Sequence, residues 1–242
     1  MNEKLRAIGD IRYESSLVDG SGIRIAREFM TKLVRAFSKQ ASSYIRATYE
    51  APFVFKERQL HSILAPALSS FTDAFLMESP VNRKWSAISS EERDDSHGWV
   101  DYWCYYRGIV FLIELKHGFI SSKTGHVRKT VKKDWKKAID QLDVIEKEAK
   151  SQSEWTNGAF RIALDILPLY ETVNSERAKT AVNNDKMLAI YSKILKEFEP
   201  LPNWSAMWIL HKDLIGPYSY PNSIEYYPSV LFISRLSEIS RS

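Results

Sequence analysis

The chain has 242 residues, a formal net charge of +4 and 44% hydrophobic residues. A chain of this length and hydrophobic content can bury one sizeable core, which excludes a disordered protein and favours a single globular unit. The single cysteine, Cys104, excludes an intramolecular disulfide and fits a reducing compartment. No stretch is apolar enough for a signal peptide or a membrane span, so we expect a cytoplasmic protein that does not bind membranes.

The N-terminal third shows helical periodicity. Hydrophobic residues recur at helical spacing over about 23–49 and again over about 55–77. Residues 1–22 are polar and end in Gly-Ser-Gly, so we expect a loosely tied segment before the first helix. We therefore predict an N-terminal segment and helix over 1–52, and the main domain over 53–242, together forming one globular unit.

Beyond Pro80 the hydrophobic period changes to two, which is typical of strands. Helical patterns return over 128–150 and 185–198. The strands predicted by this periodicity are 84–89, 99–105, 109–117, 160–170, 204–210 and 229–236. The order α, α, β, β, β, α, β, α, β, β predicts an α/β fold in which helices flank one mixed sheet.

Two of these strands are separated by Arg107-Gly108, which are suitable residues for a tight β-hairpin turn. If these two residues form the loop, Tyr106 pairs with Ile109. Continuing the antiparallel pairing then places Asp101 directly opposite Glu114. The turn therefore predicts the register of the whole hairpin.

The opposed acids need a partner of positive charge. Directly opposite residues have Cβ atoms roughly 4.5–5.5 Å apart, and two carboxylates at that distance repel each other. A divalent cation between Asp101 and Glu114 would reverse the sign of this interaction. Lys116 lies two residues after Glu114 and so points to the same face. Two acids and an ammonium at one place on a sheet suit metal-assisted hydrolysis of a phosphodiester.

Two further polar side chains lie on the apolar faces of helices. Glu57 shares a helix face with Leu60 and Leu64, so we expect it to point toward the sheet. Gln141 lies three residues after Ala138, at the edge of the apolar stripe of the 128–150 helix. Both side chains are therefore candidates for the same site.

This order of residues resembles the PD-(D/E)XK nuclease superfamily, which has the restriction-endonuclease-like fold. That family shares an α-β-β-β-α-β core with an acid on the first helix, Asp and (Asp/Glu)-x-Lys on successive strands, and often Gln on the next helix. The resemblance covers roughly residues 53–170 and implies a central mixed sheet flanked by helices, with an N-terminal helical extension. The chain departs from the pattern at Val100, where Pro is common, and at Ile145, where one branch has Tyr.

The resemblance implies a set of metal ligands. Asp101, Glu114 and the backbone carbonyl of Leu115 would hold Mg²⁺, for which Mn²⁺ can substitute. Glu57 would hold a second metal ion or a metal-bound water, and Glu50 is an alternative for this role. No organic cofactor is implied.

The resemblance also implies catalytic roles. Lys116 would orient or activate the attacking water and offset the charge that develops on phosphorus. Gln141 would position Lys116 or that water. The implied catalytic residues are Glu57, Asp101, Glu114, Lys116 and Gln141.

A basic run follows Lys116 and would bind nucleic acid through its phosphates. Only Asp134 opposes it between residues 117 and 137, and the arginines of the 23–49 helix would extend the surface. A solvated helix face is the alternative interpretation of the run. The residues predicted to bind are Lys123, Arg128, Lys129, Lys132, Lys133, Lys136 and Lys137.

We therefore predict a Mg²⁺-dependent nuclease, acting on DNA in restriction, phage defence or repair. Two alternatives fit the same residues: a nuclease-fold module that binds nucleic acid without cutting it, and a protein-interaction domain whose charged cluster is structural. Every motif position carries a residue competent for catalysis, which favours the nuclease. A homodimer is an option, because cutting two strands often uses two copies.

Overall fold

Nine strands form one sheet in the computed structural model, which describes residues 8–17, 22–82, 97–145, 156–173 and 184–239. The strands are β1 (Gly9–Ser15), β2 (Ala74–Asn82), β3 (His97–Tyr106), β4 (Ile109–His117), β5 (Ile120–Ser121), β6 (Gly158–Val173), β7 (Trp204–Leu210), β8 (Tyr218–Tyr220) and β9 (Ser223–Ile239). Their order is β1-β7-β9-β6-β4-β3-β2, with β5 beside β6 and β8 beside β9. β6 is parallel to β4 and β5, and the other pairs are antiparallel, so the sheet is mixed as predicted.

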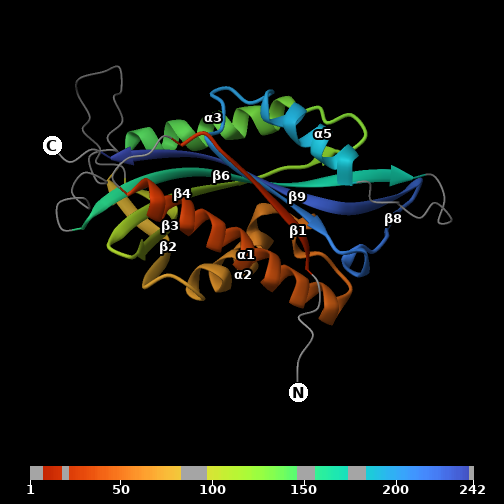
Figure 1. The fold of residues 1–242 in the computed structure, drawn as a ribbon, viewed down its shortest axis with the longest axis horizontal. Coiled ribbons are helices and arrows are strands. Elements are labelled where there is room, and N and C mark those ends of the chain that lie inside the picture. Colours follow the sequence, from red (N-terminus) through yellow and green to blue (C-terminus); the bar gives the residue numbers. More distant parts are fainter. Residues whose placement is uncertain (1–7, 18–21, 83–96, 146–155, 174–183, 240–242) are drawn as a thin grey trace.

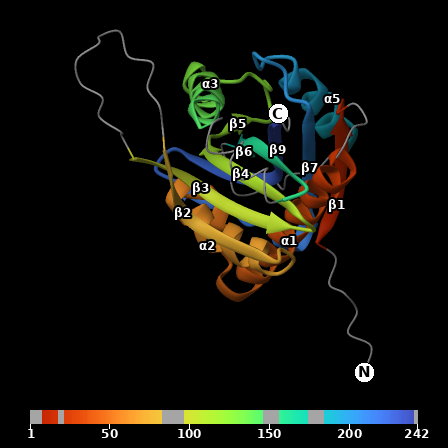
Figure 2. The same cartoon turned by 90° about the vertical axis from the view of Figure 1, so that its left-hand side faces the viewer.

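Helices cover both faces of this sheet (Figure 1). α1 (Ile23–Thr48) and α2 (Glu57–Ser69) lie on one face, and α3 (Lys129–Val144) and α5 (Asn184–Leu195) lie on the other. Short 3-10 turns, η1 (Pro52–Val54) and η2 (Lys212–Leu214), complete the described elements. A view turned by 90° shows the same arrangement, with the sheet between the helices (Figure 2). The predicted α/β class is confirmed.

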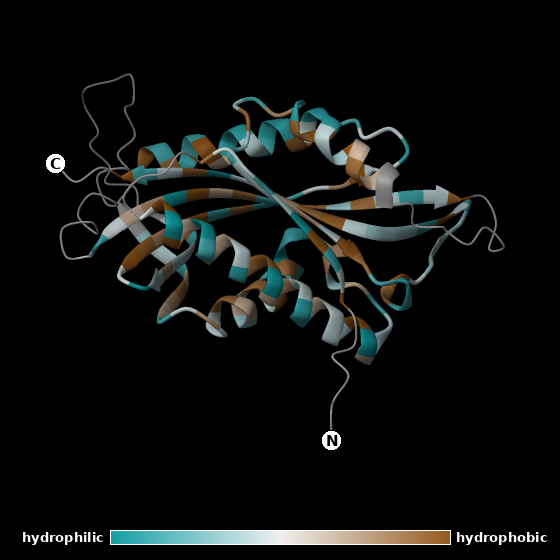
Figure 3. Cartoon of the chain, viewed as in Figure 1, coloured by the Kyte–Doolittle hydropathy of each residue, from teal (hydrophilic) through white to brown (hydrophobic). Residues whose placement is uncertain are grey.

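None of the helices in the described ranges has both the length and the apolar character needed to cross a lipid bilayer. The longest, α1, is amphipathic, with an apolar face buried against the sheet and arginines and lysines around it. Hydropathy follows the layers, since the strands in the middle are largely hydrophobic and the helices carry many hydrophilic residues (Figure 3).

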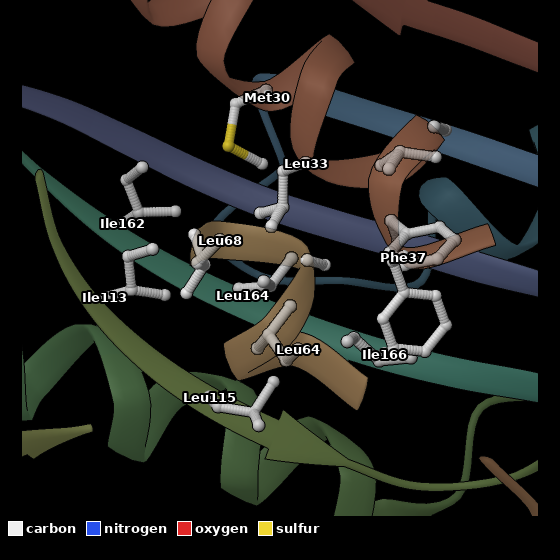
Figure 4. Packing of buried hydrophobic residues seen from close by; sticks show 14 of the residues in the cluster. Met30, Leu33, Phe37, Leu64, Leu68, Ile113, Leu115, Ile162, Leu164 and Ile166 are labelled. Carbon is white, nitrogen blue, oxygen red and sulfur yellow. The ribbon is translucent and has the colours of Figure 1, made fainter. Parts of the chain in front are cut away.

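A separate hydrophobic cluster lies on each face of the sheet. Under α1 and α2, Phe29 stacks on Phe111 with ring centroids 4.0 Å apart. Figure 4 shows the packing on this side, where residues of β4 and β6 lie against residues of the two helices. The strand residues are Ile113, Leu115, Ile162, Leu164 and Ile166, and the helix residues are Met30, Leu33, Phe37, Leu64 and Leu68. Under α3 and α5, the second cluster includes Trp135 of α3, Leu112 of β4 and residues of β6. β4 is therefore buried on both faces, as a central strand should be.

The β3–β4 hairpin has the predicted register. Tyr106 pairs with Ile109, and Arg107 and Gly108 form the loop. Both loop residues have positive φ, 50° and 82°, as expected for a tight hairpin turn of the I′ kind. Asp73 fixes the turn, because its Oδ2 accepts a hydrogen bond from the Arg107 N–H at 2.7 Å.

The second predicted helix is shorter than its periodicity indicated. α2 ends at Ser69, where the Thr72 hydroxyl and N–H both bond to the Leu68 carbonyl. The chain then forms β2, whose Phe75 packs against the core while Leu76 is exposed. The prediction of helix over 70–77 was wrong, because apolar residues at mixed spacing fit both periods there. The strand predicted over 84–89 lies outside the described residues.

The N-terminal segment is more firmly attached than predicted. β1 pairs with β7 along its whole length, from Gly9 with Leu210 to Ser15 with Trp204. The Trp208 indole N–H also donates to the Ile8 carbonyl at 2.8 Å. A loosely tied segment over residues 9–15 was therefore the wrong expectation, since a strand far along the chain supplies the pairing.

The remaining elements follow the predictions with shifted ends. β7 has the predicted bounds, and β6 continues past Pro168, which pairs with Val230, to Val173. β9 begins at Ser223, six residues before the predicted start. The predicted helix over 128–150 is described only to Ile145, because residues 146–150 lie outside the described ranges.

Candidate active site

Asp101 belongs to β3, and its side chain bonds to the backbone of β4. The main-chain pairing of β3 with β4 ends at Tyr102 and Ile113, so Asp101 is the next residue of β3 and Glu114 the next of β4. Beyond that point the Asp101 side chain reaches β4, where its Oδ2 accepts a hydrogen bond from the Leu115 N–H at 2.7 Å. The carboxylate is therefore held beside the backbone of β4 instead of simply facing Glu114 across the sheet.

The Lys116 ammonium lies where Glu114 and Leu115 converge. Its Nζ is 3.0 Å from Glu114 Oε1 and donates to the Leu115 carbonyl at 2.8 Å. The side chains of Glu114 and Lys116 are only 6% and 13% exposed. Burial acts to lower the pKa of Lys116, but Glu114, with help from Asp101 and Glu57, outweighs it and raises the pKa. The amine is therefore charged at neutral pH.

Glu57, the first residue of α2, faces the same charges. It is half-buried, and burial raises the pKa of its carboxyl. Lys116 opposes this effect and Asp101 adds to it, so both lie within electrostatic range. Glu50 is exposed, and its charge acts on Tyr218 instead. The structure therefore favours Glu57 over Glu50.

Two histidines connect η1 and α2 to the hairpin, and the sequence analysis assigned them no role. His117 Nε2 lies 3.1 Å from the carbonyl oxygen of Phe53, the residue of η1 four positions before Glu57. Burial lowers the pKa of His117 to about 4, so the neutral ring donates this bond at pH 7. His61 Nδ1 lies 2.6 Å from the Tyr102 hydroxyl. Together they hold the start of α2 near the end of β4 and the middle of β3.

Sequence reasoning missed Asp165 of β6. Its Cα pairs with that of Lys116 in the parallel ladder, and the residue is 1% exposed. Neither carboxyl oxygen has a hydrogen-bond partner in the described part of the chain. Burial raises the pKa of Asp165 well above its ordinary value, Lys116 opposes this, and Asp134 and Glu57 add to it. The only signal in the sequence was a lone acid inside an apolar strand.

Gln141 lies on the buried edge of α3, as predicted. Its amide oxygen is buried without a hydrogen bond among the described residues. No hydrogen bond found there joins Gln141 to the charges of the hairpin, so its positioning role stays a prediction. Asp134, seven residues earlier on the same helix, instead acts electrostatically on Glu57 and Asp165.

The basic residues of α3 and the loop before it are mostly exposed. Lys132 pairs with Glu197 at 2.9 Å, and Arg128 donates to the Tyr170 hydroxyl at 3.0 Å. α1 covers the opposite face of the sheet, so its arginines do not extend the surface that α3 forms. The exposed members of the predicted set are Lys123, Arg128, Lys129, Lys133, Lys136 and Lys137.

The donor atoms fit one hard cation. Within the described ranges, no three His, Cys, Asp or Glu side chains form a ready-made metal cluster. Magnesium does not need one, because it is commonly bound by one or two carboxylates and keeps several waters. Glu114 Oε1 and the Leu115 carbonyl already converge on a cation, the Lys116 ammonium, and Asp101 is held beside them. These residues fit Mg²⁺ once the ammonium has moved.

Comparisons of the chain with protein-family models, with curated proteins and with solved structures found no match. The chemistry of the site is therefore inferred from its own residues.

Proposed function

We propose that the chain is a Mg²⁺-dependent nuclease of the PD-(D/E)XK type that hydrolyses phosphodiester bonds, with DNA as the favoured substrate. The observation that carries the proposal is the gathering of Asp101, Glu114 and Lys116 at one end of the hairpin, with Glu57 from α2 beside them. The element order α2-β2-β3-β4-α3-β6, with the two-residue β5 inserted, supports it because it agrees with the α-β-β-β-α-β core of that family.

The roles follow from the charges. Asp101, Glu114 and the Leu115 carbonyl would hold the ion, which when bound polarises a phosphate and makes a bound water more acidic. Lys116 stabilises the negative charge that develops on the phosphate oxygens. Glu57 would hold a second metal ion or a metal-bound water, and its pKa, which burial raises, suits it to accept a proton from that water. Gln141 would position Lys116 or that water.

Cleavage of supercoiled plasmid DNA by the purified chain tests this proposal. We expect nicked or linear product with Mg²⁺ or Mn²⁺ and none with EDTA, because no described side chain replaces the metal as Lewis acid. Parallel assays on single-stranded DNA and on RNA define the substrate. A pure, folded sample that cuts neither DNA nor RNA with either metal would contradict the proposal.

One observation favours a second candidate, a module that binds nucleic acid without cutting it. The Lys116–Glu114 ion pair satisfies both buried charges without a metal. This candidate predicts no gain in melting temperature on adding Mn²⁺, whereas a true metal site stabilises the fold by mass action. It also predicts DNA binding that survives Asp101→Ala.

The exposed lysines of α3 are expected to contribute sequence-independent affinity for DNA. The double variant Lys133→Gln/Lys137→Gln removes two exposed positive charges. The slope of log affinity against log salt concentration should become shallower by about 2, since each phosphate contact contributes roughly 0.9. Fluorescence anisotropy of a labelled duplex in EDTA measures this slope.

The matched control is Arg24→Gln/Lys39→Gln, which removes two exposed charges from α1 on the opposite face of the sheet. Its slope should equal that of the unmodified chain. Equal slopes for both double variants would assign the α3 lysines to a merely solvated helix face.

A further inference from the structure

Asp165 is buried without a partner, although the groups around it are well satisfied. A buried carboxyl with two unbonded oxygens is rare, because each desolvated oxygen costs free energy that a hydrogen bond would offset. Within the described ranges, the other buried acid has a partner: Glu114 bonds to Lys116, which lies two residues later on the same face of β4. Asp165 therefore has unused capacity to accept hydrogen bonds beside Lys116.

We propose that Asp165 is a positioning residue that receives the Lys116 ammonium when a divalent metal ion takes over Glu114 and the Leu115 carbonyl. This inference rests on the proposed function. The Lys116 ammonium would then have two alternative positions. Without metal it would bond to Glu114 and the Leu115 carbonyl, and with metal it would pair with Asp165. Pairing with Asp165 would keep the ammonium beside the metal, where it can act on the phosphate.

The two residues can reach each other. Lys116 and Asp165 are Cα partners on adjacent parallel strands, and such strands lie about 4.7–4.9 Å apart. Both side chains point to the α3 side, because Leu112 of β4 and Ala163 of β6, at even spacing from them, belong to the cluster under α3. The flexible four-carbon stem of lysine allows its ammonium to change acceptor without movement of the backbone.

The charges around Asp165 favour its pairing with the Lys116 ammonium. Lys116 is the positive group that acts most on Asp165, and the other two groups that act on it, Asp134 from α3 and Glu57 from α2, are both acids. The arriving ammonium would favour the ionised form of Asp165, which would release its proton to solvent as the ion pair forms. A divalent ion bound at Glu114 would repel the ammonium from its position on Glu114 and the Leu115 carbonyl.

Titration of the metal-free protein with Mn²⁺ by calorimetry, without nucleic acid, tests the proposal. In Asp165→Asn the displaced ammonium has no carboxyl that can ionise to receive it, so Mn²⁺ should bind about tenfold more weakly than to the unmodified chain. Asp165→Glu restores a carboxylate and should recover most of the affinity. Asp213→Asn, which changes an exposed acid on η2, is the matched control and should bind as the unmodified chain does.

A double-mutant cycle separates this role from a structural one. In Lys116→Met no ammonium has to move, so adding Asp165→Asn should leave the Mn²⁺ affinity unchanged. A tenfold loss in both backgrounds, or in neither, would overturn the proposal. If the unmodified chain bound no Mn²⁺ and cut no DNA, the proposed function would fail as well; tight Mn²⁺ binding with an unaffected Asp165→Asn would sink this inference alone.

Thermal unfolding checks that Asp165→Asn is folded. Burial raises the pKa of Asp165 above its ordinary 3.8, so the native state holds a proton that the unfolded chain releases. Stability from this group is therefore full below pH 3.8 and falls as pH rises through the higher native value. Asn lacks this loss, so the variant should melt at or above the temperature of the unmodified chain at pH 7.

Discussion

Lys116→Met is expected to slow Mg²⁺-dependent DNA cleavage by about 10²–10³-fold, the usual effect of removing one group that stabilises charge in the transition state. The same change should tighten Mn²⁺ binding, because the ammonium no longer competes for Glu114 and the Leu115 carbonyl. Weaker catalysis with stronger metal binding is an unusual combination. Single-turnover cleavage and calorimetric titration of the same sample measure both parts.

The variant should also be unstable without metal. Removing one partner of a buried ion pair costs about 3–5 kcal/mol, and Glu114 would lose its ion pair with the ammonium. Millimolar Mg²⁺ should restore much of this loss, as urea denaturation with and without EDTA would reveal. Lys116→Arg keeps the charge and serves as the folded reference. Wild-type cleavage by Lys116→Met would remove the lysine from the mechanism.

Asp101→Ala is expected to destroy both metal binding and part of the stability of the hairpin. It removes the acceptor of the Leu115 N–H, and leaving such a group unsatisfied costs about 1–3 kcal/mol. Cleavage should be lost and Mn²⁺ should no longer raise the melting temperature. Urea denaturation measures the first effect, and thermal unfolding with Mn²⁺ measures the second.

Asp101→Asn separates the two roles. Its amide oxygen can still accept the Leu115 N–H, so the free energy of unfolding should stay close to that of the unmodified chain. Its neutral amide is a poor ligand for Mg²⁺, so cleavage should remain lost. If Asp101→Asn cut DNA normally, the carboxylate would be a structural group and the metal centre would have to lie elsewhere.

The hairpin was predictable because its signals are local. A two-residue turn fixes which residues face each other, so the pairing from Tyr106 with Ile109 to Tyr102 with Ile113 follows from counting. Counting does not give the bond of Asp101 to the Leu115 N–H, which lies beyond that pairing. Glu57 was predictable for a similar reason, since helical spacing relates it to the apolar residues of α2.

The features that the sequence did not reveal depend on distant parts of the chain. β1 owes its place to β7, and Asp165 gains meaning only because β6 lies parallel beside β4. Parallel pairing leaves no local mark, since strands joined by a long crossover can combine in several registers. The bonds of His61 and His117 join helix, turn and strand, and no spacing within one segment encodes them.

The side chains of β4 alternate between the two faces of the sheet, and this alternation restricts where residues can be inserted into the chain. Leu115 faces the leucines of α2 (Figure 4). Glu114 and Lys116 lie at even spacing from Leu112, which packs under α3, so they face α3. One residue inserted between the Gly108 turn and Glu114 would exchange these faces, placing two charges in an aliphatic layer and a leucine among the acids. Two inserted residues would keep the faces but move the charges away from Glu57. Relatives of this chain that keep its chemistry should therefore differ in the lengths of their loops. They should preserve the number of residues between the turn at Gly108 and Lys116.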